Sequence, residues 1–354
     1  MKFDYPLNGN EVFVIAEAGS NWKVGTFNED IQRAQELIKA ASNAGADAIK
    51  FQTYQAASVY SENAGKSDYL AKQGINENIE EIFDKFSMPY NMIPKLAEMC
   101  NDQKIEFMST PFSVEDAKQI DPFVLVHKVA SFEINHIRLL EFLARTQKPI
   151  LISTGASTMP EIEFAIDICK KNGNEKITLL QCTSKYPAPL SSMNLSVIKS
   201  LKDTFGIPVG FSDHSIEPTI APLLSISYGA SVIEKHFTLD KKLPGPDHSF
   251  ALEPNEFKEM RNMVKNASSI IGIGIKDIQD DEKELRQFAK RSLQAIKDIK
   301  KGEILQEGIN FDVLRPGNNS RGLEPRFLKE CEGKRVKFDI KKGEGITEFE
   351  YNLE

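Results

Sequence analysis

The segment 208–237, PVGFSDHSIEPTIAPLLSISYGASVIEKHF, contains two short apolar runs that each end in polar residues and a histidine. The first run, Pro208–Ser212, leads to His214, and the second, Ser231–Phe237, contains His236. Between them lies a longer stretch whose apolar residues recur at helical spacing. The segment therefore predicts a strand, a helix and a second strand, with polar side chains at the carboxyl end of each strand.

The same alternation of short apolar runs and longer amphipathic runs continues through most of the chain. The predicted strands are Val12–Ala18, Ala46–Thr53, Ile105–Thr110, Val124–Ser131, Pro149–Thr154, Ile177–Thr183, Pro208–Ser212 and Ser231–Phe237. The predicted helices between them include Asn28–Ala44, Pro89–Asp102, Pro160–Asn172, Leu195–Phe205 and Ile216–Tyr228. Eight such units over about 250 residues are typical of a (β/α)8 barrel. The alternative is an open doubly wound sheet, but no G-x-G-x-x-G motif follows the first strand.

The 354 residues divide by composition into a large and a small domain. We predict a barrel over 1–276, a charged linker over 277–289 and a small β-rich domain over 290–354, with little core of its own. Residues 60–88 form an unusually long connection after the second predicted strand, which in a barrel indicates a loop at the active site.

Charge and cysteine content exclude several classes of protein. The net charge of −7, with no basic run between aromatic residues, argues against nucleic acid as a partner. The four cysteines are scattered, so we expect free thiols in a reducing compartment. The first residues lack the pattern of a signal peptide, and no apolar run is long enough to cross a membrane. We therefore expect a cytoplasmic protein.

Polar side chains gather at the carboxyl ends of nearly all predicted strands, where barrel enzymes carry their catalytic residues. Strand residues two positions apart face the same way, so Lys50 and Gln52 point into one space, as do Glu234 and His236. The chosen candidates at these ends are Glu17, Lys50, Gln52, Lys128, Ser131, Glu133, Ser184, Tyr186, Ser212, His214 and His236.

The two histidines predict a metal site. The chain has only five histidines, and His214 and His236 follow neighbouring predicted strands. The alternative, for either histidine taken alone, is that it is a hydrogen-bonded residue of the core. Two imidazole ligands leave coordination positions open, which suits an ion whose coordination is completed by water and substrate. We therefore expect Mn²⁺, with Mg²⁺ or Co²⁺ as alternatives. His248 is a further candidate, and Asp213 is expected to point away from the cavity.

Two strand lysines predict a phosphate site. Lys50 and Lys128 supply cations, and Ser131, Ser184 and Ser212 supply hydroxyl donors. The alternative is that Lys128 is a Schiff-base nucleophile of a class I aldolase. Glu17 and Glu133 are carboxylates at strand ends and are candidates for acid–base catalysis. Glu234 either orients His236 or forms a salt bridge with a lysine.

Together these motifs resemble the sialic acid synthase family, enzymes that condense phosphoenolpyruvate with an N-acetylated aldose. The resemblance runs from about residue 10 to the C-terminus. The segments that carry it are IAEAGSN (15–21), AIKFQT (48–53), STPF (109–112), KVASFE (128–133), STG (153–155), CTSKYP (182–187), GFSDH (210–214), EKHFT (234–238), PGPD (244–247) and RPG (315–317).

The resemblance implies a (β/α)8 barrel followed by an antifreeze-like, or SAF, domain, in a homodimer whose small domain caps the barrel of the partner. It implies that His214 and His236 bind the metal ion, and that Glu133 transfers protons. It further implies phosphoenolpyruvate contacts from Lys50, Lys128, Ser131, Ser184 and Ser212. Sugar contacts are implied for Glu17, Gln52, Tyr186, Asp247 and, across the dimer, Arg315.

Two motifs point to different branches of the family. The segment ASFE (130–133) is similar to pseudaminic acid synthases, whereas PGPD (244–247) is similar to the neuraminic and legionaminic branches. We expect an acceptor of the N-acetylneuraminate or legionaminate type, that is, N-acetylmannosamine or a 2,4-diacetamido-trideoxyhexose. Asn21-Trp22 replaces the Asn-His of many members, and some relatives carry Asn at the position of Ser184.

Overall fold

The chain folds into two compact units that divide between Gly272 and Ile273. The structure, a computed structural model, describes residues 12–66 and 77–349. Each unit is described by itself below.

The first unit is built on eight parallel strands. They are β1 Phe13–Gly19, β2 Ala48–Thr53, β3 Glu106–Pro111, β4 His127–Val129, β5 Ile150–Ser153, β6 Ile177–Cys182, β7 Val209–Asp213 and β8 Ala230–His236. Their order in the sheet is β3-β2-β1-β8-β7-β6-β5-β4, and β3 and β4 at its two ends also contact each other. The strands therefore form the barrel that the alternating pattern predicted, and the (β/α)8 prediction is confirmed.

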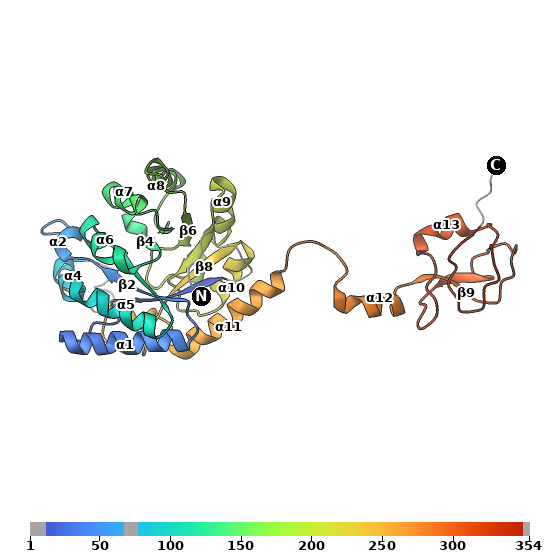
Figure 1. The fold of residues 1–354 in the computed structure, drawn as a ribbon, viewed down its shortest axis with the longest axis horizontal. Coiled ribbons are helices and arrows are strands. Elements are labelled where there is room, and N and C mark those ends of the chain that lie inside the picture. Colours follow the sequence, from blue (N-terminus) through green and yellow to red (C-terminus); the bar gives the residue numbers. More distant parts are fainter. Residues whose placement is uncertain (1–11, 67–76, 350–354) are drawn as a thin grey trace. The chain divides into compact units, whose positions relative to one another are not determined.

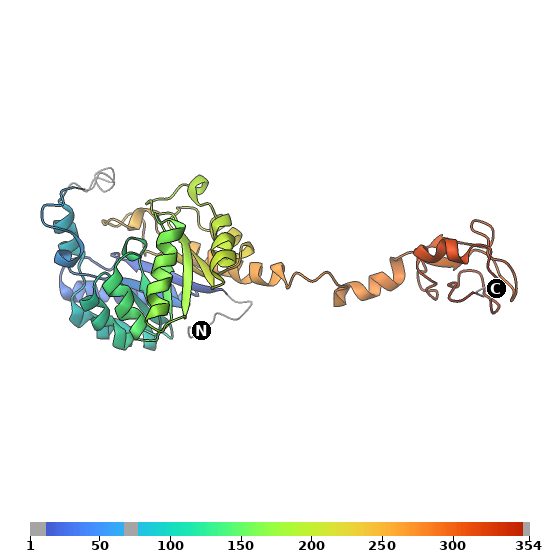
Figure 2. The ribbon, with the colours of Figure 1, turned by 90° about the horizontal axis from the view of Figure 1, so that it is seen from above.

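Helices surround the strands (Figure 1), and the view turned by 90° again shows them outside the sheet (Figure 2). They are α1 Phe27–Asn43, α2 Ala56–Val59, α4 Ile79–Phe86, α5 Ile93–Asp102, α6 Val114–Ile120, α7 Ile137–Arg145, α8 Met159–Lys171, α9 Ser196–Phe205, α10 Ile220–Ser227 and α11 Pro254–Ile271. Capping boxes begin several of them, for example Thr26 with Glu29 before α1, which satisfies amide groups that have no partner inside the helix. No helix among the described residues is long and apolar enough to span a bilayer.

Apolar side chains fill the interior of the barrel towards the amino ends of its strands, and polar side chains occupy the carboxyl ends. Phe13, Ile15, Met108, Leu151 and Leu180 belong to one buried cluster inside the strands. Larger apolar clusters lie between the strands and the helices. Because side chains alternate along a strand, the next inward position on each strand lies one layer nearer the carboxyl end. This layer holds the polar candidates.

Two predicted elements are shorter than the sequence pattern suggested. β4 covers only His127–Val129, because Ser131–Glu133 turn into a short 3-10 helix. α10 begins at Ile220, four residues after the predicted start, because residues 213–217 form a loop around the buried Lys235. Residues 67–76 of the long connection lie outside the described residues, and the part that follows contains α4.

The second unit carries α12 Lys283–Ala289, the antiparallel pair β9 Ser292–Ala295 and β10 Phe311–Leu314, and α13 Leu328–Cys331. The expectation that it has little core of its own is wrong. Ten apolar residues form a buried cluster: Leu293, Ala295, Ile299, Leu305, Phe311, Cys331, Val336, Ile340, Ile346 and Phe349. Single apolar residues from many short runs converge there, which a search for long periodic segments does not detect.

Candidate active site

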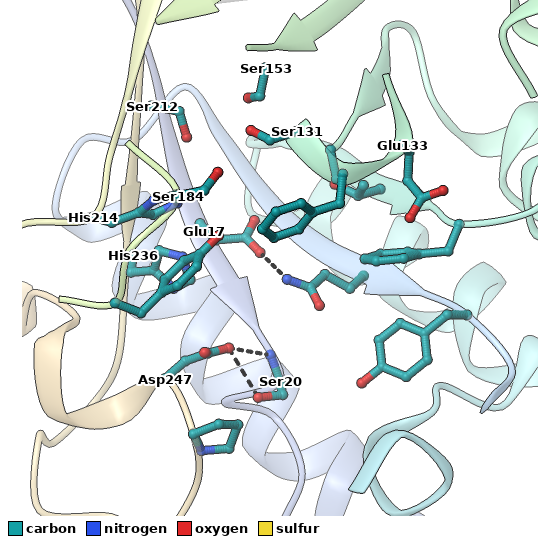
Figure 3. A pocket seen from close by; sticks show the side chains of 18 of the residues that line it. Glu17, Ser20, Ser131, Glu133, Ser153, Ser184, Ser212, His214, His236 and Asp247 are labelled. Atoms are coloured by element: carbon teal, nitrogen blue, oxygen red, sulfur yellow. Dashed lines mark hydrogen bonds between the residues drawn. The ribbon is translucent and has the colours of Figure 1, made fainter. Parts of the chain in front are cut away.

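A cavity of about 650 Å³ opens at the carboxyl ends of the barrel strands. Figure 3 shows side chains from several strands that point into it. The sequence-based candidates that line it are Glu17, Lys50, Gln52, Lys128, Ser131, Glu133, Ser184, Tyr186, Ser212, His214, His236 and Asp247. Arg315 belongs to the second unit, where it is exposed. The structure thus gathers these twelve candidates at one place, while their individual roles stay predictions.

The floor of the cavity is a chain of alternating charges. Lys50 forms an ion pair with Glu17 and lies 3.7 Å from Glu234 Oε1. The same oxygen lies 3.6 Å from Lys128 Nζ and accepts a hydrogen bond from Ser212 Oγ at 3.2 Å. All of these charged side chains are buried. Of the two interpretations of Glu234, the structure therefore supports the salt bridge with lysines.

Burial and neighbouring charges shift the pKa values of this floor in different directions. Burial raises the pKa of Glu17 to about 7, although Lys50 opposes that rise. Burial alone lowers the pKa of Lys50, but Glu17 and Glu234 raise it by more. Burial lowers the pKa of Lys128, although Glu234 opposes that change. A partly protonated Glu17 leaves the floor with excess positive charge, which favours an anionic ligand.

The two candidate metal ligands are neighbours. The ring centroids of His214 and His236 are 5.3 Å apart, and both side chains are buried. His214 Nδ1 lies 3.0 Å from the carbonyl oxygen of Thr183, which orients the ring and leaves Nε2 available. His236 Nδ1 is buried and has no hydrogen-bond partner among the described residues. An orphaned buried imidazole nitrogen beside a second imidazole fits a metal site.

The protonation of the two histidines differs. Burial and the nearby cations hold the pKa of His236 well below its usual value, so this ring is neutral and able to bind a metal. Burial alone lowers the pKa of His214, but Cys182 and the Thr183 carbonyl raise it to about 9. A metal ion would have to displace that proton. Across residues 12–66 and 77–349, no three His, Cys, Asp or Glu side chains converge as a metal cage. The protein therefore offers two nitrogen ligands and open positions.

The further candidate, His248, lies outside the cavity. His248 contacts Thr238 Oγ1 at 2.7 Å and does not line the cavity. The expectation that Asp213 points away from the cavity is confirmed, because it forms a buried ion pair with Lys235 at 2.7 Å.

Hydroxyl groups line the side of the floor nearest Lys128. Ser153 accepts a hydrogen bond from Lys128 at 2.8 Å, and Ser131 Oγ accepts from the backbone amide of Gly155 at 3.0 Å. Ser184 Oγ is buried without a hydrogen-bond partner in the described parts of the chain. A Cβ on Gly155 would lie 2.2 Å from Ser184 Oγ, so only glycine leaves room for these hydroxyls. Ser184 therefore presents an unsatisfied donor to the cavity.

Carboxyl groups stand on two other sides of the cavity. Burial raises the pKa of Glu133 to about 7, in the range that suits a general base or acid near neutral pH. Asp247 Oδ2 accepts hydrogen bonds from Ser20 Oγ at 3.1 Å and Ser20 N at 3.4 Å (Figure 3). Gln52 donates to Glu17 Oε1 at 3.1 Å.

The described part of the long connection 60–88 lies at the cavity, as its length predicted, but sequence reasoning missed that it supplies an apolar outer wall. Ile79, Ile82, Phe83 and Phe86 of α4 line it together with Val59, Tyr54, Tyr60 and Phe112. The Phe83 ring lies between two tyrosines, 4.8 Å from the centroid of Tyr54 and 4.9 Å from that of Tyr60. The available signal for its apolar character was the spacing of the apolar residues at 79, 82, 83 and 86. The cavity therefore has a charged floor and an apolar wall.

Comparisons with known proteins agree with this geometry. Residues 37–276 match the NeuB family, and residues 290–348 match the SAF domain. A pseudaminic acid synthase of Campylobacter jejuni is 39% identical over 96% of this chain and 97% of its own. An N,N'-diacetyllegionaminic acid synthase of the same species is 38% identical over 96% of this chain and 99% of its own.

A solved structure covers both units. The crystal structure of the spore coat polysaccharide biosynthesis protein SpsE from Bacillus subtilis is 37% identical, with a TM-score of 0.63, over 95% of this chain and 94% of its own. The relatives are named as synthases of different nonulosonic acids, at nearly equal identity. With its barrel, its SAF domain and relatives along nearly its whole length, the chain belongs to the NeuB family and is an enzyme of the sialic acid synthase type.

Proposed function

We propose that the enzyme condenses phosphoenolpyruvate with an acetamido aldose and water, giving a nine-carbon sialic-type acid and phosphate. The observation that carries this proposal is the meeting of Lys50, Lys128, His214, His236 and Glu133 in one cavity. That set supplies cations for an anionic donor, two nitrogen ligands for a metal and a carboxyl group with a raised pKa.

The floor suits the phosphate and carboxylate of phosphoenolpyruvate. Lys50 and Lys128 provide buried positive charge, and Ser131, Ser184 and Ser212 provide hydroxyl groups around it. Ser184 supports this assignment most directly, because its buried hydroxyl lacks a partner among the described residues and a phosphate oxygen would supply one.

His214 and His236 would hold a divalent ion, for which Mn²⁺ is the leading candidate. When bound there, such an ion supplies a Lewis acid that polarises the carbonyl group of the open-chain sugar. The imidazoles contribute neutral nitrogen donors, and the neighbouring Tyr186 ring, 4.2 Å from that of His214, packs against the ligand set.

The proposed condensation has three steps. The C3 carbon of phosphoenolpyruvate attacks the aldehyde carbon, the aldehyde oxygen takes up a proton and becomes a hydroxyl group, and positive charge develops at C2 of the donor. Water adds to C2 while Glu133 accepts its proton, and the resulting tetrahedral intermediate loses phosphate to leave the 2-keto acid. Glu133 suits this step because its raised pKa lets it both take up and release a proton near neutral pH.

The acceptor sugar would lie between the floor and the apolar wall. Gln52, Tyr186 and Asp247, which line the cavity, would bind its hydroxyl groups. Apart from the hydroxyl groups of Tyr54 and Tyr60, the wall around Phe83 is apolar, so it favours an acceptor whose far end carries methyl or acetamido groups. This observation supports a 2,4-diacetamido-trideoxyhexose over N-acetylmannosamine, with the pseudaminate and legionaminate branches both open.

The second unit completes the proposal. In a homodimer with exchanged SAF domains, Arg315 of one subunit would reach the sugar bound by its partner. Its exposure in the unit that carries it is compatible with such a role, and its planar guanidinium suits an amide oxygen.

A Schiff-base aldolase is the second candidate. It draws support from Lys128, whose pKa burial lowers, as a nucleophilic amine requires. In an aldolase, borohydride with pyruvate would trap a covalent adduct on Lys128, and mass spectrometry would locate it. A metal-dependent synthase would show no adduct.

The deciding experiment measures phosphate release from phosphoenolpyruvate with a panel of acetamido sugars, with and without Mn²⁺. Sugar-dependent release that chelation abolishes supports the proposal. Absence of release with every sugar, together with a borohydride adduct, would replace it with the aldolase.

A further inference from the structure

A buried ion pair lies on the outer faces of the two strands that carry the candidate metal ligands. Asp213 precedes His214 at the end of β7, and Lys235 precedes His236 at the end of β8. Lys235 Nζ lies 2.7 Å from Asp213 Oδ2, and neither side chain is exposed. The two residues are also partners in the β7–β8 ladder. The pair therefore joins the strands immediately behind the two imidazoles.

Lys235 does more than neutralise Asp213. Its ammonium group also donates to the carbonyl oxygens of Ser215 at 2.7 Å and Glu217 at 2.8 Å, and it contacts Ser215 Oγ at 3.0 Å. Asp213 Oδ1 in turn accepts from the backbone amide of Ser215 at 2.8 Å. The loop from Asp213 to Glu217 is thus wrapped around one ammonium group, whose three donors are all engaged.

The sheet itself fixes only one of the two histidines. His236 is the last residue of β8 and is paired with Glu17 of β1. The pairing of β7 with β8 ends at Asp213, so His214 is the first residue beyond that ladder. On one flank its carbonyl accepts from the amide of Ala188 at 2.9 Å. On the other flank, the loop held by Lys235 begins directly after it.

We propose that Lys235 is a positioning residue for the metal site, which it serves without touching the metal. By holding residues 213–217 against the end of β8, its ammonium group fixes the separation of His214 from His236. This inference rests on the proposed function only in that the two histidines bind a metal ion. A purely structural ion pair is the alternative, and it would support the fold without affecting metal affinity.

The test uses the metal-free protein and measures Mn²⁺ affinity by electron paramagnetic resonance of the free ion. Lys235→Met keeps a long unbranched side chain, one atom shorter, and removes the ammonium group that holds the loop. If Lys235 positions His214, the dissociation constant for Mn²⁺ rises about 10- to 100-fold, the usual effect of losing a residue that orients a ligand. The affinity for phosphoenolpyruvate, measured by calorimetry, stays unchanged.

A second variant keeps the test valid if Lys235→Met fails to fold with Asp213 left unpaired. The double variant Asp213→Asn, Lys235→Met removes both charges and still lacks the group that holds the loop, so its Mn²⁺ affinity falls in the same way. Arg261→Met is the matched control. It removes an ion pair with Asp47 at the opposite end of the strands, and it lowers the melting temperature without changing Mn²⁺ affinity.

The outcomes separate the inference from the proposed function. Wild-type affinity for Mn²⁺ in a folded double variant overturns the positioning role and leaves the metal site intact. Equal loss of Mn²⁺ and phosphoenolpyruvate affinity also overturns it, because general loosening would explain both. If the wild-type protein itself binds no divalent metal, the metal site of the proposed function is wrong, and the positioning role falls with it.

Discussion

Glu234 Oε1 lies 3.6 Å from Lys128 Nζ, inside the barrel and away from water. The same oxygen lies 3.7 Å from Lys50 Nζ, so one carboxylate serves two buried cations. Removing it would leave the positive charge of both lysines less compensated, which is costly for buried charges.

The first prediction concerns this carboxylate. Glu234→Gln should lower the free energy of unfolding by about 3 kcal/mol, because it breaks a buried ion pair and leaves charge uncompensated. Added phosphate or phosphoenolpyruvate should restore part of the loss, since the anion replaces the missing charge. Thermal melts with and without phosphate provide the measurement. A variant whose melting temperature does not respond to phosphate would contradict a phosphate site on this floor.

The second prediction concerns the metal. His214→Ala and His236→Ala should each abolish turnover and weaken Mn²⁺ binding, because water cannot replace an imidazole ligand without loss of affinity. His248→Ala serves as control, since that ring contacts Thr238 and lies outside the cavity. Calorimetric titration with Mn²⁺ reports binding independently of activity. Full activity after exhaustive chelation would show that no metal is needed.

The third prediction concerns pH. Burial raises the pKa of Glu133 from its ordinary value of 4.5 to about 7. If Glu133 is the base that takes the proton of water, kcat/KM should rise with pH through about 7 and level off above it. Glu133→Gln should lower kcat at least about 100-fold. Its kcat/KM should also no longer fall as pH drops below about 7. If kcat/KM of Glu133→Gln still falls below about pH 7 as in the wild type, another group is responsible for the pH dependence.

The same shift has a consequence for stability. Between pH 4.5 and about 7 the folded protein holds a proton on Glu133 that the unfolded chain releases. This group therefore favours the folded state at low pH, and that contribution is lost as pH rises through about 7. Comparing the melting temperatures of wild type and Glu133→Gln across this range isolates the effect.

The fourth prediction concerns the apolar wall. Phe83→Ala removes the half-buried ring between Tyr54 and Tyr60, so KM for the acceptor should rise several-fold to about 100-fold, since a lost apolar contact in a pocket costs about 1–3 kcal/mol. KM for phosphoenolpyruvate should not change. The loss should be larger for a diacetamido-trideoxy sugar than for N-acetylmannosamine. Phe164→Ala, which removes an exposed ring from α8, is the matched control. Equal losses for both sugars would show that the wall does not determine which sugar the enzyme prefers.

The fifth prediction concerns Arg315 and the proposed dimer. Arg315→Ala should weaken sugar binding much more than phosphoenolpyruvate binding. Mixing Arg315→Ala subunits with Glu133→Ala subunits should restore activity, because one site of the mixed dimer then carries both lesions and the other carries neither. Absence of recovery in dimers shown to have exchanged subunits would mean that Arg315 acts within its own chain or outside the site.

The barrel and its polar rim were predictable because they follow from local rules. Residues two positions apart on a strand, such as Lys50 and Gln52, face the same side of the sheet, so this alternation alone predicted that both point into the barrel. The same rule separated Asp213, which faces outward, from Ser212, which faces the cavity. Local periodicity carries this information without any knowledge of the packing.

Other features depend on contacts between distant segments, which periodicity does not encode. The bridging role of Glu234 requires two lysines from β2 and β4 to meet one carboxylate from β8. The wall around Phe83 requires a helix inside a long connection to fold against the mouth of the barrel. The core of the second unit likewise joins single residues from many short runs. In each case the deciding interaction joins residues far apart in the sequence.

The alternating floor of Glu17, Lys50, Glu234 and Lys128 has one more consequence. An incoming dianion does not meet bare cations, because each lysine already has a carboxylate beside it. Repulsion between the new charge and Glu17, whose pKa burial has already raised to about 7, would then draw a proton onto that carboxylate. If phosphoenolpyruvate binds to this floor as proposed, its binding near neutral pH should therefore be accompanied by proton uptake from solvent.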